Sequence, residues 1–600
     1  MVNLIVRFAN VGSLSSHIAM SDVNNIMPFQ KLRNFIPLLA ILILAIFLRL
    51  WQIDSVPPGL YPDIAINGND ALDTLATGQF KVFYPENNGR EGLFIWLIAL
   101  SFKIFGPAVW SLRLVSAVFG IFTVWGLYLL TRRLFNKNIA LLSSFFLAVS
   151  FWHINFSRLG FRAILVPFFL VWSFYFLFRG IAEIRTCGKL GVPHLNVGHR
   201  VSHMSHIIPF ILAGLFFGLG FYTYIAFRAA VLILGAVFLL EVLTYWRKNK
   251  PFSWRLSNLW QKVYLKDGWW KWDIMFLTIV LVILPLAGYF YQHPQDFIGR
   301  SAGVSVFNAP RPWLELGKSV LLTLGMFNFK GDLNWRHNFS GSPMLVWPVG
   351  LFFVLGFVLT IKNIFLKNGV KIGGSPPSKR GAAPNFENGA NSIFLLTWFL
   401  SMLSPALLTN EGLPHALRAI GVIPVVYIFA ALGLFWLANR VKKLKPKKPA
   451  AFLGTVLLIF ILMAVAFSDF NQYFFKWAKN PEVAGAMRLD LVDLSQYLNN
   501  LPASVKKYVI VNEPGVAVPY PHGLPMPAQT IIFIQRTANS EQRTVYLTPS
   551  DINQIKIVNH QPAVIIPTQP DQNIFNQLSQ KWPQGKIEKI NYFYEYKINQ

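Results

Sequence analysis

Residues 35–51 read FIPLLAILILAIFLRLW, and residues 52–73 after them read QIDSVPPGLYPDIAINGNDALD. The first run is apolar and close to the length that crosses the roughly 30 Å hydrocarbon core of a bilayer. The second run carries four aspartates, at positions 54, 63, 70 and 73, in a chain whose formal net charge is +28. The pair predicts a membrane span that leads into an unusually acidic loop.

Apolar runs of similar length recur through the rest of the chain. Of its 600 residues 54% are hydrophobic and only 13% are charged, which excludes an ordinary soluble protein. Together with 35–51, ten further blocks make eleven predicted spans. These blocks are 112–130, 139–156, 163–178, 207–226, 229–246, 274–291, 344–361, 392–409, 419–438 and 450–467.

Charge between the blocks predicts the orientation. The loops 131–138, 179–206, 247–273, 362–391 and 439–449 all carry more Lys and Arg than Asp and Glu. Because basic loops stay inside, we expect the N-terminus inside and the acidic loop outside. The shorter block Leu93–Phe105 precedes Gly106-Pro107, and we expect a helix lying in the membrane interface there. The same placement of basic residues favours membrane orientation over binding of nucleic acid.

The composition predicts three parts: a cytoplasmic segment 1–34, a transmembrane domain 35–470 and an extracytoplasmic α/β domain 471–600. In the last part, we expect strands at Tyr508–Val511, Thr530–Ile534 and Ala563–Ile566 and an amphipathic helix at Asp490–Leu501. The fold class is therefore an α-helical integral membrane protein of about 11 spans with a small C-terminal α/β domain.

The start of the sequence and its cysteine content add little. No short apolar region with a cleavage site opens the chain, so we expect 35–51 to be a retained span, with Met20 or Met27 as alternative starts. A single cysteine, Cys187, excludes an intramolecular disulfide framework.

The predicted outer loops collect polar residues that topology alone does not explain. Taken singly, an arginine there anchors a helix end to headgroups and a histidine packs at a helix end. Their convergence opposite one acidic loop instead indicates a site for an anion. The residues are His153, Arg158, Arg162, Arg228, Asp332, Arg336, His337, His415 and Arg418.

Transfer of a sugar from a lipid phosphate requires this combination. Arginine stabilises the leaving phosphate with bidentate bonds and keeps its proton. A carboxylate within hydrogen-bond reach takes the proton of the acceptor hydroxyl as it attacks the anomeric carbon. A single displacement with one base inverts that carbon, whereas a retaining enzyme typically uses a second carboxylate as nucleophile.

At these residues the chain resembles the C-superfamily (GT-C) glycosyltransferases that use polyprenyl-phosphate sugars, near protein O-mannosyltransferases and aminoarabinose transferases. The resemblance covers roughly residues 35–470. It rests on PPGLYPD at 57–63 with Asn67-Gly68, GREGLFI at 89–95, RLVSA at 113–117 running to RRLF at 132–135, HINFSR at 153–158, GDLNWRHN at 331–338 and PHALR at 414–418.

The resemblance implies roles for single residues. The first-loop motif of the group is Asp-Glu, and its Asp, here Asp63, is the expected catalytic base; Ile64 stands at the Glu position. Asp70 is the second candidate base. We expect the donor phosphate to be bound by Arg158, Arg162, Arg228, Arg336, His337 and Arg418, with His153, His415 and Asp332 as further site candidates. No metal ligands and no cofactor are predicted, and a need for a divalent metal stays open.

The predicted function is an inverting glycosyltransferase of the cell envelope, multi-pass in the plasma membrane, with its active site outside. Its partners would be a polyprenyl-phosphate-linked sugar, membrane lipid and an acceptor protein, lipid or glycan, without nucleic acid. The alternatives are a lipid-linked polysaccharide polymerase or ligase, and a non-catalytic transporter or scaffold. No Gly-rich phosphate loop is present, which argues against an ATP-driven pump.

The topology is directly testable. Reporter fusions at Lys445 and at Ala503 should report opposite sides of the membrane, because one predicted span, 450–467, lies between them. Alkaline phosphatase, active outside, should be active only at Ala503, and a reporter active inside only at Lys445. The same side for both positions would overturn the predicted orientation.

Overall fold

The computed structural model describes residues 29–189, 200–248, 269–365, 388–443, 448–518, 523–538, 544–557 and 561–599. Residues 1–28 of the predicted N-terminal segment and much of the predicted inner loops lie outside these residues. The chain separates into a unit Met1–Ala40 and a unit Ile41–Gln600. Helix α2 (Phe29–Leu50) begins in the first unit, and all later elements belong to the second.

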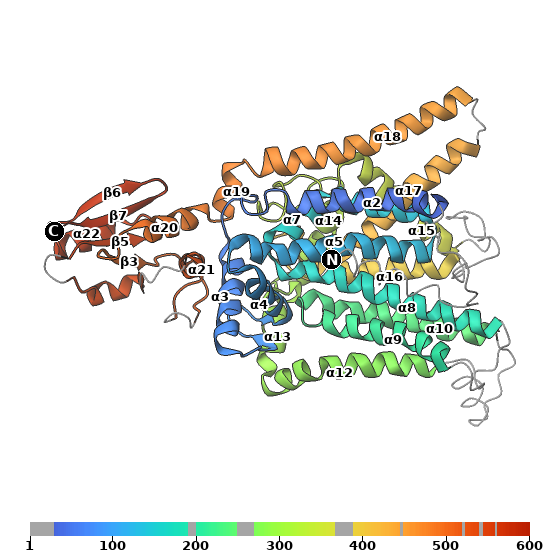
Figure 1. Cartoon of the computed structure of the whole chain (residues 1–600), viewed down its shortest axis with the longest axis horizontal. Helices are drawn as coiled ribbons and strands as arrows, with labels where there is room; N and C mark the ends of the chain where they lie inside the picture. The colour runs from blue at the N-terminus through green and yellow to red at the C-terminus, as the bar shows by residue number, and fades with distance from the viewer. Residues whose placement is uncertain are drawn as a thin grey trace, which may run out of the picture. The chain divides into compact units, whose positions relative to one another are not determined.

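Long apolar helices make up most of the second unit, and they run side by side in Figure 1. In the described part of the chain, eight of them are long and apolar enough to cross a membrane. They are α5 (Val109–Leu134), α8 (Leu165–Lys189), α10 (Ala230–Lys248), α12 (Trp270–Gln292), α15 (Trp347–Phe365), α16 (Asn388–Leu407), α17 (Ile423–Lys443) and α18 (Lys448–Asn471).

Three further predicted spans are helical but are not single long helices of this kind. The helices α6 (Lys137–Val149) and α7 (Phe151–Leu159) are long and apolar enough only together, as one pair bent by 56°. Ser150 makes the break, since it ends α6 and its side chain accepts the His153 N–H at the start of α7. The described apolar parts of α2 and of α9 (Arg200–Gly220) are shorter than 18 residues. The chain is a multi-span helical protein, and the count of eleven stays a prediction.

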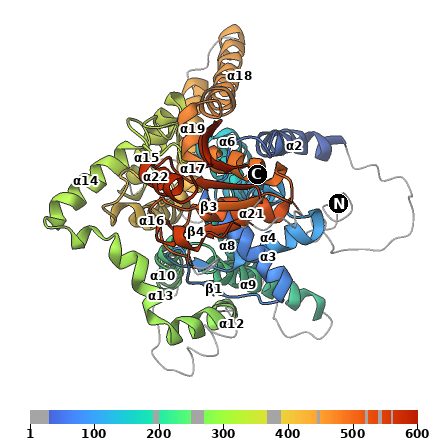
Figure 2. The same cartoon turned by 90° about the vertical axis from the view of Figure 1, so that its left-hand side faces the viewer.

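The helices differ in how far they are enclosed. Most residues of α8 and α17 are buried, whereas few of α12 and α18 are, and Figure 2 shows these two at opposite margins of the bundle. Exposed apolar side chains such as Leu281 and Phe460 suit contact with lipid. Helix α15 packs on α17 at glycines: a Cβ on Gly356 would lie 1.8 Å from the Phe429 carbonyl oxygen.

The acidic loop is itself folded. Tyr61 precedes helix α3 (Pro62–Thr77), where Pro62 occupies the first turn and Gly78 ends the helix with φ 71°. A short antiparallel hairpin comes next, made of β1 (Phe83–Tyr84) and β2 (Arg90–Glu91). The predicted helix at Leu93–Phe105 is confirmed as α4, which packs on α3 and α5.

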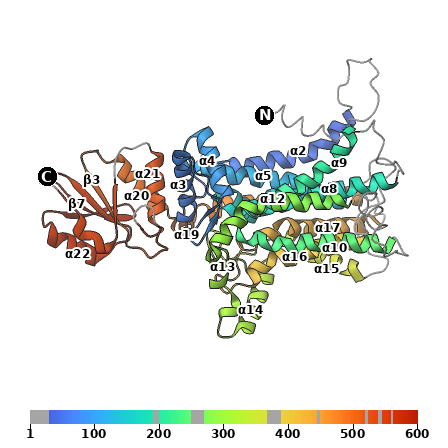
Figure 3. The same ribbon diagram turned by 90° about the horizontal axis from the view of Figure 1, so that it is seen from below.

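The C-terminal region contains a five-stranded sheet of order β4-β3-β5-β7-β6. The parallel strands are β3 (Lys506–Ile510), β4 (Thr544–Leu547) and β5 (Ala563–Pro567); β6 (Lys586–Ile590) and β7 (Phe593–Ile598) form an antiparallel hairpin beside β5. Helices α20 (Leu489–Asn500) and α21 (Ala528–Thr537) pack against one face of the sheet, and α22 (Gln572–Lys581) packs against the other face (Figure 3). The predicted helix and two predicted strands are therefore confirmed.

The predicted strand at Thr530–Ile534 is wrong, because these residues lie in α21. Its β-branched residues favour a strand only weakly, and burial on all sides overrides that preference. Every residue from Ala528 to Gln535 is buried, since α21 packs between α20 and α3. The side chain of Asn69 donates to the Gln529 carbonyl oxygen, and Arg536 pairs with Asp73 at 2.6 Å. Helix α21 thus joins the sheet region to the acidic loop.

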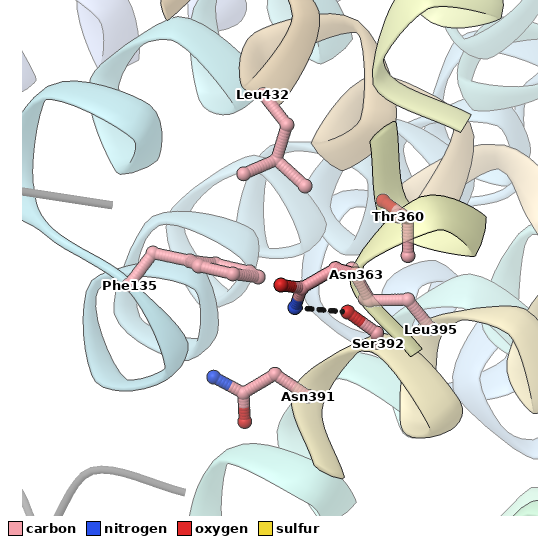
Figure 4. A pocket seen from close by; sticks show the side chains of 7 residues that line it. All are labelled: Phe135, Thr360, Asn363, Asn391, Ser392, Leu395 and Leu432. Carbon is pink, nitrogen blue, oxygen red and sulfur yellow. Dashed lines mark hydrogen bonds between the residues drawn. The ribbon is translucent and has the colours of Figure 1, made fainter. Parts of the chain in front are cut away.

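A small polar cavity of about 10 Å³ lies among α5, α15 and α16 (Figure 4). Asn363 donates to the Ser392 hydroxyl at 2.9 Å, and Asn391 donates to the Leu134 carbonyl oxygen at 2.8 Å. The space suits about one water molecule and is too small for a substrate.

We expect Gly356→Ala to destabilise the protein, because the new methyl group would force α15 and α17 apart. Overpacking of this kind costs about 1–3 kcal/mol. The control is Gly235→Ala in α10, where a Cβ would meet no atom within 4 Å. The melting temperature in detergent should fall for Gly356→Ala only, and an equal melting temperature for both variants would contradict the close packing.

Candidate functional site

Two buried arginines hold the turn that leads from α2 to the acidic loop. Arg158 donates to the carbonyl oxygens of Leu48, Trp51, Gln52 and Val56 at 2.7–3.1 Å. A second arginine, at position 113, donates to the carbonyls of residues 53, 54 and 59. Buried guanidinium groups need such partners, and buried carbonyl groups need donors in turn. The turn before Asp63 is therefore tightly positioned.

Asp63 stands in the first turn of α3 and is half-buried. Asn87 of the hairpin donates to its Oδ1 at 3.0 Å, and no other residue in the described ranges hydrogen-bonds this carboxylate. The guanidinium carbon of Arg336 lies 3.7 Å from the ring centroid of Tyr61. Burial raises the pKa of Tyr61, the Asp63 charge raises it further and Arg336 opposes both. The acid and the cation therefore border the same ring.

Asp70, the second candidate base, is engaged within the loop. Arg90, fully buried, pairs with its Oδ2 at 2.5 Å and also donates to Asn67 Oδ1 at 3.0 Å. Burial raises the pKa of Asp70, and Arg90 opposes that rise. The same guanidinium donates to the Glu86 carbonyl oxygen, so the network ties α3 to the hairpin. Its geometry is that of a structural ion pair.

Two of the predicted arginines interact with Glu91 of the hairpin. Arg162 donates to its Oε2 at 3.2 Å and to the Gly89 carbonyl oxygen at 3.0 Å. Arg228 interacts electrostatically with the same carboxylate and lies 4.1 Å from the Phe297 ring centroid. The hairpin thus contacts Asp63 through Asn87, and it has two cations near Glu91.

The loop 331–342 and the turn 408–419 meet at Asp332. Its Oδ2 contacts His337 Nδ1 at 3.0 Å and accepts the Ala416 N–H at 2.8 Å. The rings of His337 and His415 lie 5.0 Å apart, and one ligand atom from each of the three residues lies within 4.8 Å of the others. These three residues, named the Asp-His-His cluster below, are the group of His, Cys, Asp or Glu in the described residues that has metal-binding spacing.

An open cleft of about 760 Å³ lies beside the loop that carries Asp63. Arg488 lines it and forms ion pairs with Asp490 and Glu513 at 2.7 and 2.6 Å. Its charge also acts on Tyr61, which places the cleft near the Tyr61 ring. The full lining is Pro58, Ala478, Lys479, Asn480, Pro481, Ala484, Gly485, Arg488, Leu489, Asp490, Glu513, Gln569 and Tyr592.

Other predicted site residues have hydrogen-bond partners within the fold. The terminal guanidinium nitrogens of Arg158 donate to backbone carbonyls, and His153 accepts from Arg49 at 2.7 Å in the buried interior. Arg418 donates to the Glu411 carboxylate and carbonyl at 2.8 Å. Ile64 is fully buried against Gly160, so the Glu position of the motif faces the core.

Sequence reasoning did not select Glu91, Asn87, Tyr61 or Arg488 as site residues. Glu91 and Tyr61 fall within motifs that it did identify, GREGLFI and PPGLYPD. Asn87 and Arg488 carry no sequence signal, because one comes from a loop and the other from a region more than 400 residues away.

Residues 93–192 match the family model described as "Dolichyl-phosphate-mannose-protein mannosyltransferase". An uncharacterized protein of Aquifex aeolicus (strain VF5) is 33% identical over 120 residues, a match that covers 19% of this chain and 24% of that protein. The chain therefore spans about a quarter of this relative.

Among solved structures, ArnT from Cupriavidus metallidurans in the apo state is similar with a TM-score of 0.50 at 12% identity. The match covers 94% of this chain and 98% of ArnT. The oligosaccharyltransferase AglB from Archaeoglobus fulgidus matches with a TM-score of 0.45 at 17% identity, over 79% of this chain and 59% of AglB.

The chain has the fold of ArnT and, over residues 93–192, the sequence pattern of the dolichyl-phosphate-mannose-protein mannosyltransferases, which confirms the resemblance to the GT-C glycosyltransferases that its motifs indicated.

Proposed function

We propose that this protein transfers a sugar from a polyprenyl-phosphate carrier to an acceptor hydroxyl, on the extracytoplasmic side of the plasma membrane and with inversion at the anomeric carbon. The observation that carries the proposal is the half-buried Asp63 carboxylate, held by one amide and bordered by the Arg336–Tyr61 stack. A carboxylate and a cation border the same ring, which supports the proposal because sugar transfer from a lipid phosphate requires a base and a cation for the phosphate.

Asp63 is the general base in this proposal. Asn87 orients one carboxylate oxygen and leaves Oδ2 available to the acceptor hydroxyl. The proton moves from that hydroxyl to Asp63 while the new C–O bond forms and the bond to the phosphate oxygen breaks. Asp70 is a poorer base because it is bound to Arg90.

Arg336, Arg162 and Arg228 are the proposed phosphate ligands. Arg336 is half-buried, and its side-chain hydrogen bonds go to Asn334 and Tyr61, both neutral groups. Arg162 pairs with Glu91 at 3.2 Å, and the charge of the same carboxylate acts on Arg228, so we assign both cations to the phosphate. Arg158 is not part of the proposal, since the turn before α3 uses its donors.

The acceptor enters through the cleft lined by Arg488. Pro58 at its wall belongs to the turn that precedes Asp63, so a hydroxyl reaching inward from the cleft approaches the base. The amides of Asn480 and Gln569 and the exposed ring of Tyr592 suit a polar acceptor that presents hydroxyl groups.

We expect Asp63→Asn to lower turnover by about 10²–10⁴-fold while donor binding persists, because asparagine keeps the shape but accepts no proton. Purified protein is incubated with a panel of polyprenyl-phosphate sugars, and released polyprenyl phosphate is measured. Asp73→Asn, on the same helix, should keep its turnover. Normal turnover of Asp63→Asn with loss in Asp70→Asn would assign the base to Asp70.

We expect Arg336→Ala to weaken donor binding as well as turnover, because the phosphate is charged before and after transfer. Binding of a polyprenyl phosphate is measured directly on the detergent-solubilised protein. The control is Arg132→Ala, whose side chain stacks on Tyr128 in the last turn of α5. Equal donor affinity in the two variants would remove Arg336 from the phosphate site.

A further inference from the structure

We propose that Asp332, His337 and His415 bind one divalent transition-metal ion, with Zn²⁺ as the best-fitting metal. The three side chains come from two separate loops, and one ligand atom from each lies within 4.8 Å of the other two. Two imidazoles and one carboxylate are a ligand set that zinc takes in proteins, with a fourth position left for an outside ligand.

The distances between the ligand atoms suit a small ion. Asp332 Oδ2 and His337 Nδ1 are 3.0 Å apart. In a tetrahedral site with metal–ligand bonds of about 2.1 Å, neighbouring ligand atoms are roughly 3.4 Å apart. A metal ion would therefore replace the proton between these two atoms with little movement of either side chain.

His415 completes the set from the other loop. Its ring centroid is 5.0 Å from that of His337, and the two rings are inclined by 36°. His415 is half-buried, whereas Asp332 and His337 are 2% and 4% exposed. The less enclosed side chain is the one that adjusts on binding, and it leaves the open coordination position on its own side of the cluster.

The cluster is held in place before any ion binds. Asp332 Oδ1 accepts the Asn334 N–H at 2.8 Å, and Oδ2 accepts the Ala416 N–H at 2.8 Å. The second bond joins the aspartate to the residue next to His415, so one carboxylate sets the distance between the loops. Bonds of this kind around a ligand fix its orientation and raise metal affinity.

The position of the cluster gives the ion a role, which rests on the proposed function. His337 is the residue after Arg336, the proposed phosphate ligand on the Tyr61 ring. A phosphate oxygen at the open coordination position would share its charge between the metal and the guanidinium group, which stabilises the leaving phosphate. Metal binding itself does not depend on this role.

The test measures metal on the full-length protein in detergent, purified without a histidine tag and stripped with a chelator. Zn²⁺ is added back, and bound zinc is measured by mass spectrometry and by competition with a fluorescent chelator. We expect one zinc ion per chain, and His415→Ala should weaken the affinity by more than about 100-fold, since loss of an outer partner alone costs 10–100-fold. Co²⁺ in place of Zn²⁺ should give the visible absorption of a tetrahedral site.

The control is His293→Ala, whose ring stacks on Tyr289 away from the cluster and whose zinc binding should equal that of wild type. The melting temperature of His415→Ala checks that this variant folds. Equal zinc content in wild type and His415→Ala, or no zinc in wild type, overturns the proposal. Zinc binding without sugar transfer would leave the metal site standing and overturn only the proposed function.

Discussion

The bonds from Arg113 and Arg158 to the backbone of residues 48–59 are the constraint on which the outer end of this protein depends. An apolar helix ends at Leu50, and the chain must then turn within a few residues before α3 begins. Buried carbonyl groups of such a turn need hydrogen-bond donors, and few are available outside a helix or strand. Seven carbonyl groups between residues 48 and 59 accept from these two guanidinium groups.

These bonds also position the candidate base. Tyr61 and Asp63 come directly after the turn, so their positions relative to α5 and α7 are set by where the two arginines sit. Arg158 is in turn enclosed by the rings of Tyr473 and Phe474 from the end of the last long helix. Segments more than 400 residues apart thereby fix one loop, which suits a site whose groups must lie within contact distance of a substrate.

The arginines around this loop differ in what they contact. The guanidinium groups of Arg113 and Arg158 donate to backbone carbonyl groups of the turn. Arg162, Arg228 and Arg336 also contact side chains, namely Glu91, the Phe297 ring and the Tyr61 ring. The Asp-His-His cluster adjoins the last of these arginines through the sequence step from Arg336 to His337. The proposed phosphate ligand and the proposed metal ligand are thus adjacent in the chain, so the two proposals are compatible.

The sequence alone determined the features that depend on local pattern. Apolar runs predicted the helices of the bundle, a short apolar run predicted the helix Leu93–Phe105, and short strand-like runs predicted β3 and β5. Motifs indicated the relatives and the Asp63 loop. These features depend on the length and period of runs of residues, which any sequence displays directly.

Only the tertiary structure decided which partner each polar residue has. Arg158 and Arg162 are four residues apart and look alike in sequence, yet one binds four carbonyl groups and the other binds Glu91. Thr530–Ile534 became a helix because α3 and α20 enclose it, and Asp332 reached Ala416 across 84 positions. Partners distant in the chain decide each outcome, and the free energy of burying a charge or a carbonyl group depends on those partners, which no local pattern encodes.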